Sequence, residues 1–287
     1  MSQPKRFLLR VAAGAARILP APVKRWLYRV PVLSKLVRRS LNAAAPKGMS
    51  EVEIAAGILR GMRMTLDLQT EKDYWLGTYE PDLQEAARQF IQPGMTVYDV
   101  GANIGYISLI AARLTGKSGR VYSFEALPKN IERLKGNVQL NHLEGRVRVI
   151  HAAVTDSTGE AVFLAHESGA MGKALGSAGR ETQYAAELRV PAVALDDFVY
   201  QDGNTPPQVV KMDIEGGEGM ALRGIRRILK EVHPILMIEL HGQEAARQVW
   251  EILDGAGYRI HTMSRGMPKV NSLDELDWKA YIVAKPK

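Results

Sequence analysis

Apolar residues recur along this chain with two alternating periods. Short apolar runs bounded by glycine, proline or charged residues predict buried strands, and apolar positions three or four residues apart predict amphipathic helices. The predicted strands are 96–100, 120–124, 146–151, 209–213 and 235–240. The predicted helices are 81–90, 104–114, 128–140, 218–231 and 243–255. Such alternation is typical of an α/β protein with a mostly parallel sheet covered by helices on both faces.

Three further segments complete the predicted architecture. Residues 258–262 and 279–284 have no clear helix between them and predict an antiparallel pair that finishes a seven-stranded sheet. Residues 61–68 predict a hairpin arm ahead of the first helix. Residues 161–190 lack helical periodicity, contain several glycines, and predict a hairpin with a mobile loop over the site, a candidate substrate lid.

The turn after the first strand carries the pattern Asp99-x-Gly101-x-Asn103-x-Gly105. Glycine permits turn dihedrals and a close approach of the backbone to a ligand, and the following helix points unpaired N–H groups at the turn. Glu125 ends the second strand, twenty residues after Gly105, where nucleotide-binding folds place a carboxylate for ribose hydroxyls. The pattern therefore predicts a nucleotide cofactor.

The charge of the turn favours one class of cofactor. A dinucleotide fingerprint has a glycine where pyrophosphate packs, and here Asn103 places a side chain in the middle of the turn. The carboxylate of Asp99 would repel a diphosphate and attract an ammonium and a sulfonium group. We therefore expect S-adenosylmethionine instead of NAD.

Charge and composition add a second feature, at the N-terminus. The chain has 287 residues, 46% apolar content and no cysteine, which excludes disulfides, cysteine zinc sites and a thiol nucleophile. The net charge is +7, yet residues 1–50 contain no acid. The remainder of the chain has 27 basic and 31 acidic residues. The basic residues of this leader are Lys5, Arg6, Arg10, Arg17, Lys24, Arg25, Arg29, Lys35, Arg38, Arg39 and Lys47.

The leader has helical periodicity with apolar and basic faces, although Pro31 interrupts its second half. Its apolar runs are too short to span a bilayer. We predict two parts, residues 1–50 as a basic amphipathic leader and residues 51–287 as the catalytic domain. The leader is expected to hold the protein peripherally on an anionic cytoplasmic membrane face. A helical cap on the domain, nucleic-acid binding and a transit peptide are the alternatives.

Polar residues also gather at the ends of two central strands. Lys211, Asp213, Glu215 and Glu218 follow one strand, and Glu239 and His241 follow its expected neighbour. Ligands bind outside the carboxyl ends of parallel strands, so these residues mark a second part of the site. A solvated rim of charges is the alternative.

Together these segments resemble a known family. Tyr79-Glu80, Asp99 to Tyr106, Phe124-Glu125, Lys211 to Gly216 and Glu239-Leu-His241 are similar to the FkbM family of S-adenosylmethionine-dependent methyltransferases, over residues 61–242. The wider methyltransferase class often has glycine where Asn103 stands. The resemblance implies a Rossmann-like class I methyltransferase fold and O-methylation, commonly of sugars in glycans, glycolipids or natural products. The basic leader lies outside the family signature.

The resemblance also assigns residues to the cofactor. Asp99, Gly101, Asn103 and Gly105 would surround its methionine end, and Glu125 would hold the ribose. Ala153 would lie near the adenine, and Tyr79 and Glu80 would close over the cofactor.

For the chemistry, a sugar hydroxyl must be aligned with the methyl group and must lose a proton. We expect His241 to act as the general base, oriented by Glu239 or Asp213. The alternative is a divalent metal such as Mg²⁺ on Asp213, Glu215 and Glu239, which would lower the pKa of the hydroxyl. Lys211 would pair with these acids or stabilise the alkoxide. A strand-end histidine with a structural role is the simplest competing interpretation.

Three other functions compete with sugar O-methylation. A nucleic-acid methyltransferase would use the same loop, but the acidic strand ends discourage a polyanion. A nicotinamide-dependent oxidoreductase conflicts with Asn103. A non-enzymatic membrane adaptor could keep the fold without the activity. We expect a saccharide or glycolipid acceptor and no nucleic acid, and the sequence leaves acceptor identity and oligomeric state open.

Overall fold

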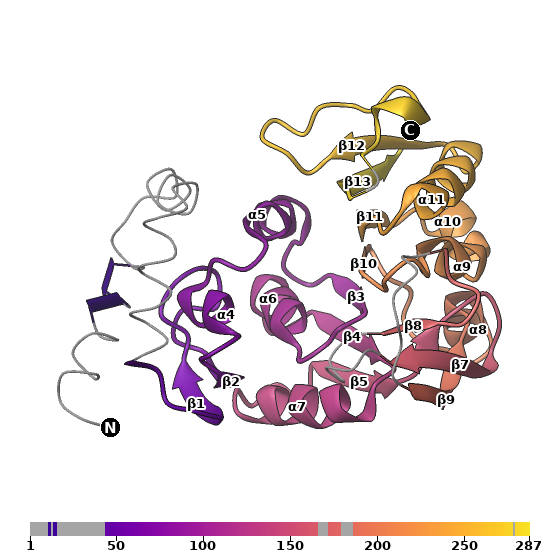
Figure 1. The fold of residues 1–287 in the computed structure, drawn as a ribbon. Helices are drawn as coiled ribbons and strands as arrows, with labels where there is room; N and C mark the ends of the chain where they lie inside the picture. The colour runs from indigo at the N-terminus through magenta and orange to yellow at the C-terminus, as the bar shows by residue number, and fades with distance from the viewer. Residues whose placement is uncertain (1–10, 13, 16–43, 166–171, 179–185, 278) are drawn as a thin grey trace. The chain divides into compact units, whose positions relative to one another are not determined.

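The computed structural model describes residues 11–12, 14–15, 44–165, 172–178, 186–277 and 279–287 (Figure 1). The chain forms two compact units, Met1–Pro81 and Asp82–Lys287. Within the described residues, no helix has the length and apolar content needed to cross a bilayer. Most of the predicted amphipathic leader, residues 1–10, 13 and 16–43, lies outside the described residues.

The described part of the first unit is built on a β-hairpin. Strands β1 (Met49–Glu53) and β2 (Arg63–Asp67) pair antiparallel, and the short helix α4 (Lys72–Leu76) follows. The predicted hairpin arm is therefore confirmed. The predicted boundary between residues 50 and 51 falls inside β1.

A seven-stranded sheet forms the centre of the second unit, with the strand order β12-β13-β11-β10-β3-β4-β5. Five consecutive strands of this order, β11, β10, β3, β4 and β5, run parallel to one another. Strand β13 is antiparallel to both of its neighbours, β11 and β12. This confirms the predicted mostly parallel sheet and its antiparallel finish. The strands are β3 (Thr96–Val100), β4 (Arg120–Glu125), β5 (Val147–His151), β10 (Val209–Met212), β11 (Ile235–Glu239), β12 (Tyr258–Thr262) and β13 (Tyr281–Pro286).

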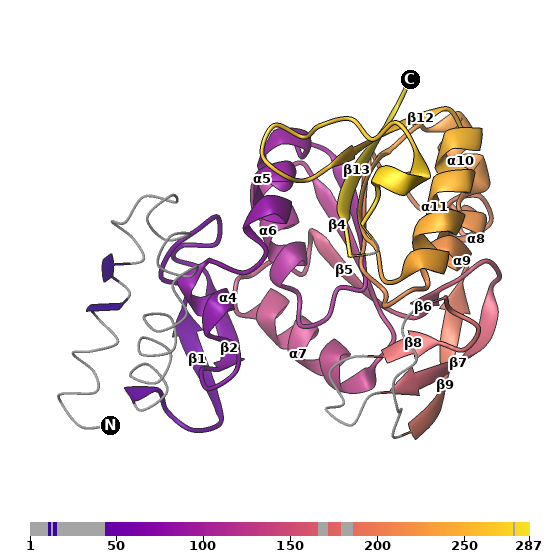
Figure 2. The same cartoon turned by 45° about the horizontal axis from the view of Figure 1, so that its top comes forward.

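Helices cover both faces of this sheet (Figure 2). One face carries α5 (Pro81–Phe90), α6 (Tyr106–Thr115) and α7 (Pro128–Gln139). The other carries α8 (Leu195–Tyr200), α9 (Glu218–Arg223), α10 (Arg226–Glu231) and α11 (Gln243–Gly255). The predicted single helix over 218–231 was wrong, because it breaks at Gly224, where a Cβ atom would lie 2.2 Å from the carbonyl oxygen of Thr155.

Side-chain alternation along the central strands separates the core from a polar layer. Tyr98, Tyr122, Phe124 and Phe198 pack edge to face on the α8 side, with ring centroids 5.1 to 5.7 Å apart. Because successive strand residues point to opposite faces, Asp99 projects towards α6 instead. The sheet therefore has an aromatic cluster on one side, and the polar residues Asp99 and Ser123 are buried among apolar ones on the other.

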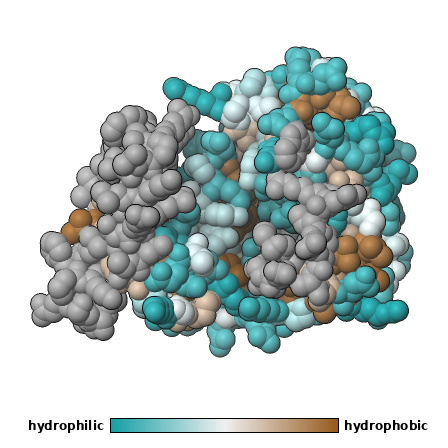
Figure 3. Space-filling view, viewed as in Figure 1, coloured by the Kyte–Doolittle hydropathy of each residue, from teal (hydrophilic) through white to brown (hydrophobic). Residues whose placement is uncertain are grey.

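A second, four-stranded sheet has the order β6-β9-β7-β8. Its strands are β6 (Ala153–Val154), β7 (Gly159–Ala165), β8 (Gly172–Ala174) and β9 (Ala186–Val193). This confirms the predicted hairpin in the region 161–190, and residues 166–171 and 179–185 of the proposed lid lie outside the described residues. In the view of Figure 3 most described surface residues are hydrophilic, and the hydrophobic ones form small separate patches.

Candidate functional site

Most predicted site residues of the second unit lie at or just beyond the carboxyl ends of adjacent strands. Gly101 follows β3, Glu125 ends β4, Asp213 follows β10, and Glu239 ends β11. Because these strands are parallel, their carboxyl ends meet at one edge of the sheet. Residues separated by more than a hundred positions in the sequence are thereby brought to one place.

The turn after β3 is held in an unusual backbone conformation. Gly101, Asn103 and Gly105 have φ angles of 76°, 49° and 92°, all in the region that favours glycine. A Cβ atom on Gly101 would lie 1.9 Å from the carbonyl oxygen of Asp213, and one on Gly105 would lie 2.4 Å from Leu134 Cδ1. The glycines therefore allow the turn to pack closely on the loop after β10 and on α7. We expected these glycines to let the backbone approach a ligand, and the structure shows that they also let it approach neighbouring protein atoms.

Glu125 joins the turn after β3 to the turn after β4. Its Oε2 accepts a hydrogen bond from Asn103 N at 2.8 Å, and its Oε1 accepts one from Leu127 N at 2.9 Å. Burial raises the pKa of this carboxyl, although these amide donors act in the opposite direction. A carboxylate offers about four acceptor positions, so Oε2 retains capacity for a ligand hydroxyl.

Asp99 belongs to a buried polar chain that the sequence did not reveal. Ser123 Oγ donates to Ser108 Oγ at 2.8 Å, and Ser108 Oγ donates to Asp99 Oδ2 at 2.6 Å. All three side chains are buried. Because Ser108 comes from α6 and Ser123 from β4, neither shared a motif with Asp99, and only the packing of α6 on the sheet identifies them.

Lys211 connects the cofactor turn to the second cluster. Its Nζ donates to the carbonyl oxygen of Gly101 at 2.9 Å and lies 3.5 Å from Asp99 Oδ1 and 3.7 Å from Asp213 Oδ2. The expected pairing of Lys211 with the acids is therefore present. The charge of Asp99 is balanced inside the protein, so the partly exposed carboxylates beyond it supply the acidic character of the site.

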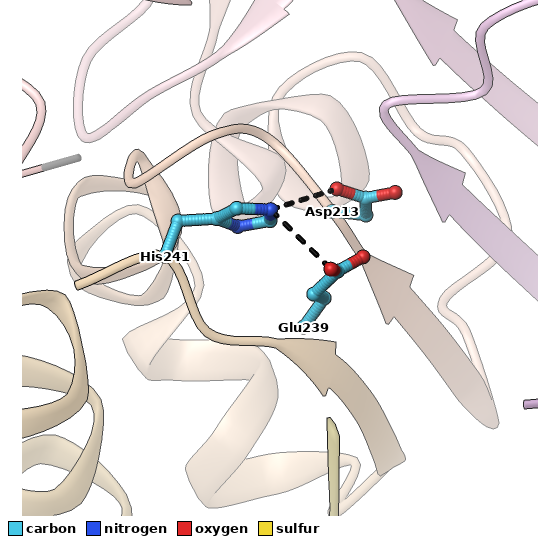
Figure 4. Close-up of side chains that lie close together, drawn as sticks. All are labelled: Asp213, Glu239 and His241. Atoms are coloured by element: carbon cyan, nitrogen blue, oxygen red, sulfur yellow. Dashed lines mark ion pairs between the residues drawn. The ribbon is translucent and has the colours of Figure 1, made fainter. Parts of the chain in front are cut away.

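Those carboxylates surround the imidazole of His241. Figure 4 shows the ring directed at Asp213 and Glu239. His241 Nε2 lies 3.6 Å from Glu239 Oε1, 3.7 Å from Asp213 Oδ1 and 3.7 Å from Glu215 Oε2. His241 is 6% exposed, whereas the three carboxylate side chains are 21 to 39% exposed. The cluster is thus an open acidic group built around a buried imidazole.

A fourth acid, Glu218, holds the other ring nitrogen. His241 Nδ1 lies 3.1 Å from Glu218 Oε1, which also accepts hydrogen bonds from Ile214 N and Gly216 N at 3.2 Å each. Glu218 is fully buried. We expected Glu239 or Asp213 to orient His241; Glu218 holds Nδ1, and those two residues face Nε2. Glu218 stands at the start of α9, and its role depends on how α9 packs against the end of β11.

The charges around His241 change its protonation. Burial by itself lowers the pKa of the imidazole, but the hydrogen bond to Glu218 and the charges of Glu218, Asp213 and Glu215 outweigh it and raise the pKa to about 9. This direction of shift favours the protonated imidazole at neutral pH.

The cluster also has the composition of a metal site. One ligand atom each from Asp213, Glu239 and His241 lie within 4.8 Å of one another. The sequence suggested Asp213, Glu215 and Glu239, and the structure groups His241 with two of these acids. Glu215 lies beside the group.

The remaining predictions concern Ala153, the pair Tyr79 and Glu80, and the lid. Ala153 is buried in β6, where it pairs with Ala192 of β9. Tyr79 and Glu80 belong to the first unit, and their approach to the cofactor stays a prediction. In the region of the predicted lid, Ala178 N donates a hydrogen bond to the carbonyl oxygen of Gly216 at 3.0 Å. The described segment 172–178 therefore contacts the loop after β10.

Comparison with known proteins gives a family of methyltransferases. The model of the methyltransferase FkbM domain matches residues 99–260. The chain is 26% identical over 161 residues to the hexuronic acid methyltransferase AglP of Haloferax volcanii, a match that covers 56% of this chain and 62% of AglP. It is 26% identical over 204 residues to the 31-O-demethyl-FK506 methyltransferase FkbM of Streptomyces tacrolimicus, with coverage of 59% and 75%. The match thus spans less than two thirds of the length of AglP.

Among solved structures, methyltransferase FkbM from Methylobacillus flagellatus superposes with a TM-score of 0.44 at 19% identity. That superposition covers 76% of this chain and 54% of the other.

Proposed function

The chain belongs to the methyltransferase FkbM family of S-adenosylmethionine-dependent enzymes, and from this membership we propose that it is an O-methyltransferase for a saccharide hydroxyl. The acceptor would be part of a glycan, a glycolipid or a related metabolite. Two relatives support the choice, because one is named for a hexuronic acid and the other for an oxygen position of FK506. Membership in a methyltransferase family speaks against the oxidoreductase alternative.

One observation carries the proposal. The turn after β3 and the group Asp213, Glu239 and His241 lie at the same edge of the sheet, joined by Lys211 and by the close contact of Gly101 with Asp213. A methyl transfer needs a donor and an acceptor side by side, and effective alignment supplies much of the rate enhancement. The proximity of the two groups of residues supports the proposal.

The donor half fits the cofactor of the family. When bound, S-adenosylmethionine supplies an electrophilic methyl group. Glu125 has acceptor capacity at Oε2 for ribose hydroxyls, and its two amide donors fix the carboxylate in place. We assign the remaining contacts to Asp99, Gly101, Asn103, Gly105 and Ala153.

The acceptor half suits a polyhydroxylated substrate. Asp213 and Glu239 are partly exposed, and carboxylates are suitable acceptors for hydrogen bonds from sugar hydroxyls. The Nε2 atom of His241 lies 3.7 Å from Asp213 Oδ1 and 3.6 Å from Glu239 Oε1. Their negative charge disfavours a nucleic-acid backbone. We therefore assign these three residues to the binding and orientation of the acceptor hydroxyl, and Lys211 to the neutralisation of Asp213 and Asp99.

Two measurements test the proposal. Calorimetry should show that the full-length protein binds S-adenosylhomocysteine and does not bind NAD, and Glu125→Ala should weaken this binding at least about tenfold because it removes a charged hydrogen-bond partner. Mass spectrometry of glycans and glycolipids from cells with and without the protein should reveal species that differ by one methylene unit. Binding of neither ligand, or identical saccharide profiles, would contradict the function.

A further inference from the structure

We propose that Asp213, Glu239 and His241 form a site for one divalent cation, suited to Mn²⁺, with Glu218 as the residue that positions the imidazole. The three side chains come from the ends of two neighbouring strands, β10 and β11, and their ligand atoms lie within 4.8 Å of one another. The role of the ion in catalysis rests on the proposed function, whereas its binding does not.

The spacing of the side chains suits a shared ion better than direct hydrogen bonds. His241 Nε2 lies 3.6 Å from Glu239 Oε1 and 3.7 Å from Asp213 Oδ1, and N–H···O hydrogen bonds have lengths of about 2.7–3.2 Å. Ligand atoms about 2.1 Å from a tetrahedral or octahedral ion stand about 3.0–3.4 Å apart. Small rotations of the two carboxylates would bring all three ligand atoms to such an ion.

The imidazole points its second nitrogen into the group. His241 is 6% exposed, and its Nδ1 is held by fully buried Glu218 at 3.1 Å. This leaves Nε2 as the ring nitrogen directed at the carboxylates (Figure 4). Metal-binding histidines usually donate the other ring N–H to a carboxylate, which fixes the tautomer and the orientation of the ring. Glu218 occupies that position.

Glu218 also shapes the loop that carries Asp213. It accepts hydrogen bonds from Ile214 N and Gly216 N, while Asp213 N donates to the carbonyl oxygen of Val100 at 3.1 Å. The backbone of Asp213 is therefore fixed by β3, and the residues that follow it are fixed by Glu218. One buried acid thus positions two of the three ligands.

The ligand set selects among cations. Mg²⁺ prefers oxygen ligands alone, and Zn²⁺ in proteins is bound mainly by nitrogen and sulfur. A set of two carboxylates and one imidazole matches neither preference fully and favours Mn²⁺. A set of carboxylates alone would have suggested Mg²⁺. A bound cation would hold the oxygen of the acceptor hydroxyl and lower its pKa, and the released proton would pass to water.

The test uses full-length protein treated with EDTA and then dialysed. Binding of Mn²⁺ is followed by electron paramagnetic resonance, where the six-line signal of the free ion decreases on binding. We expect about one Mn²⁺ per chain, tighter than Mg²⁺ in competition. Asp213→Asn and His241→Ala should each weaken binding at least tenfold, and Glu218→Gln should weaken it about tenfold as a positioning residue. His241→Gln replaces the alanine variant if the latter does not fold.

Glu215→Gln is the matched control, because it removes one charge 3.7 Å from His241 Nε2 without removing a ligand. We expect this variant to change Mn²⁺ affinity less than threefold. An equal loss in Glu215→Gln and Asp213→Asn would mean that diffuse negative charge attracts the ion, and would overturn the site. S-adenosylhomocysteine binding is measured on every sample. A protein that binds S-adenosylhomocysteine but not Mn²⁺ would refute the cation site and leave the proposed function intact.

Discussion

At the scale of single residues, buried charges organise this site. Asp99 is fully buried and Lys211 is 4% exposed, and they occupy paired positions on neighbouring strands β3 and β10. Burying either charge alone would carry a large desolvation cost, which the pair and its hydrogen bonds offset. The same lysine contacts Gly101 and Asp213, so one side chain serves both stability and the geometry of the two site halves.

Lys211→Met should reveal the stability contribution of this pair. The substitution leaves the charge of Asp99 without its cation, and removal of one partner of a buried pair costs about 3–5 kcal/mol. Because the pair is 3.5 Å apart, we expect the lower end of that range, about 3 kcal/mol, in the free energy of unfolding measured with urea. The double variant Asp99→Asn with Lys211→Met should recover at least half of the loss. Additive losses would show that the two charges do not stabilise each other.

At the scale of elements, the break between α9 and α10 shows how a helix end is made far from its own sequence. The segment 218–231 has continuous helical periodicity, yet Gly224 turns the chain. Asp196, in the first turn of α8, accepts hydrogen bonds from Arg227 N at 2.8 Å and from Ile228 N at 3.0 Å. The amide groups at the start of α10 are therefore capped by a residue about thirty positions earlier in the chain.

Substitution of Asp196 tests this long-range cap. Asp196→Ala should lower the free energy of unfolding by about 1 kcal/mol, because capping carboxylates contribute about 0.5–2 kcal/mol. Asp196→Asn keeps one of the two acceptor oxygens and should lose about half as much. Thermal and urea unfolding of the two variants provide the measurement. An unchanged free energy of unfolding in Asp196→Ala would contradict the cap.

At the scale of the whole molecule, the family match and the unusual charge belong to different parts of the chain. Residues 99–260 match the family model, while the excess basic charge lies in residues 1–50. The second unit, Asp82–Lys287, contains the whole match. We therefore propose that the basic leader adds a separate property, peripheral binding to the anionic inner face of the cytoplasmic membrane.

Liposome flotation of full-length variants tests the leader. A variant with Lys24, Arg25 and Arg29 changed to Gln should lose about 3 kcal/mol of attraction to anionic vesicles, or about a hundredfold in partitioning. The matched control changes three exposed lysines of the second unit, Lys117, Lys129 and Lys135, to Gln. Full-length substitutions are preferable to a truncation near residue 50, because β1 spans Met49–Glu53. Equal flotation of both variants would argue against a membrane role for the leader.

The sequence by itself determined the strands of the central sheet, most of the helices that cover it and the two polar segments of the site. It could do so because strand and helix periods are local properties, and because parallel strands bring their carboxyl ends to one edge. Gly101, Glu125, Asp213 and His241 were identifiable on that basis.

Only the tertiary structure decided which polar groups meet. Ser108 reaches Asp99 because α6 packs on β3, and Glu218 reaches His241 because α9 packs beside β11. Each contact depends on how two elements approach one another, and no residue spacing along the chain encodes that approach. For the same reason, the partners of Asp99 and His241, which set the charge balance of the site and the protonation of its imidazole, followed from the fold and not from any motif.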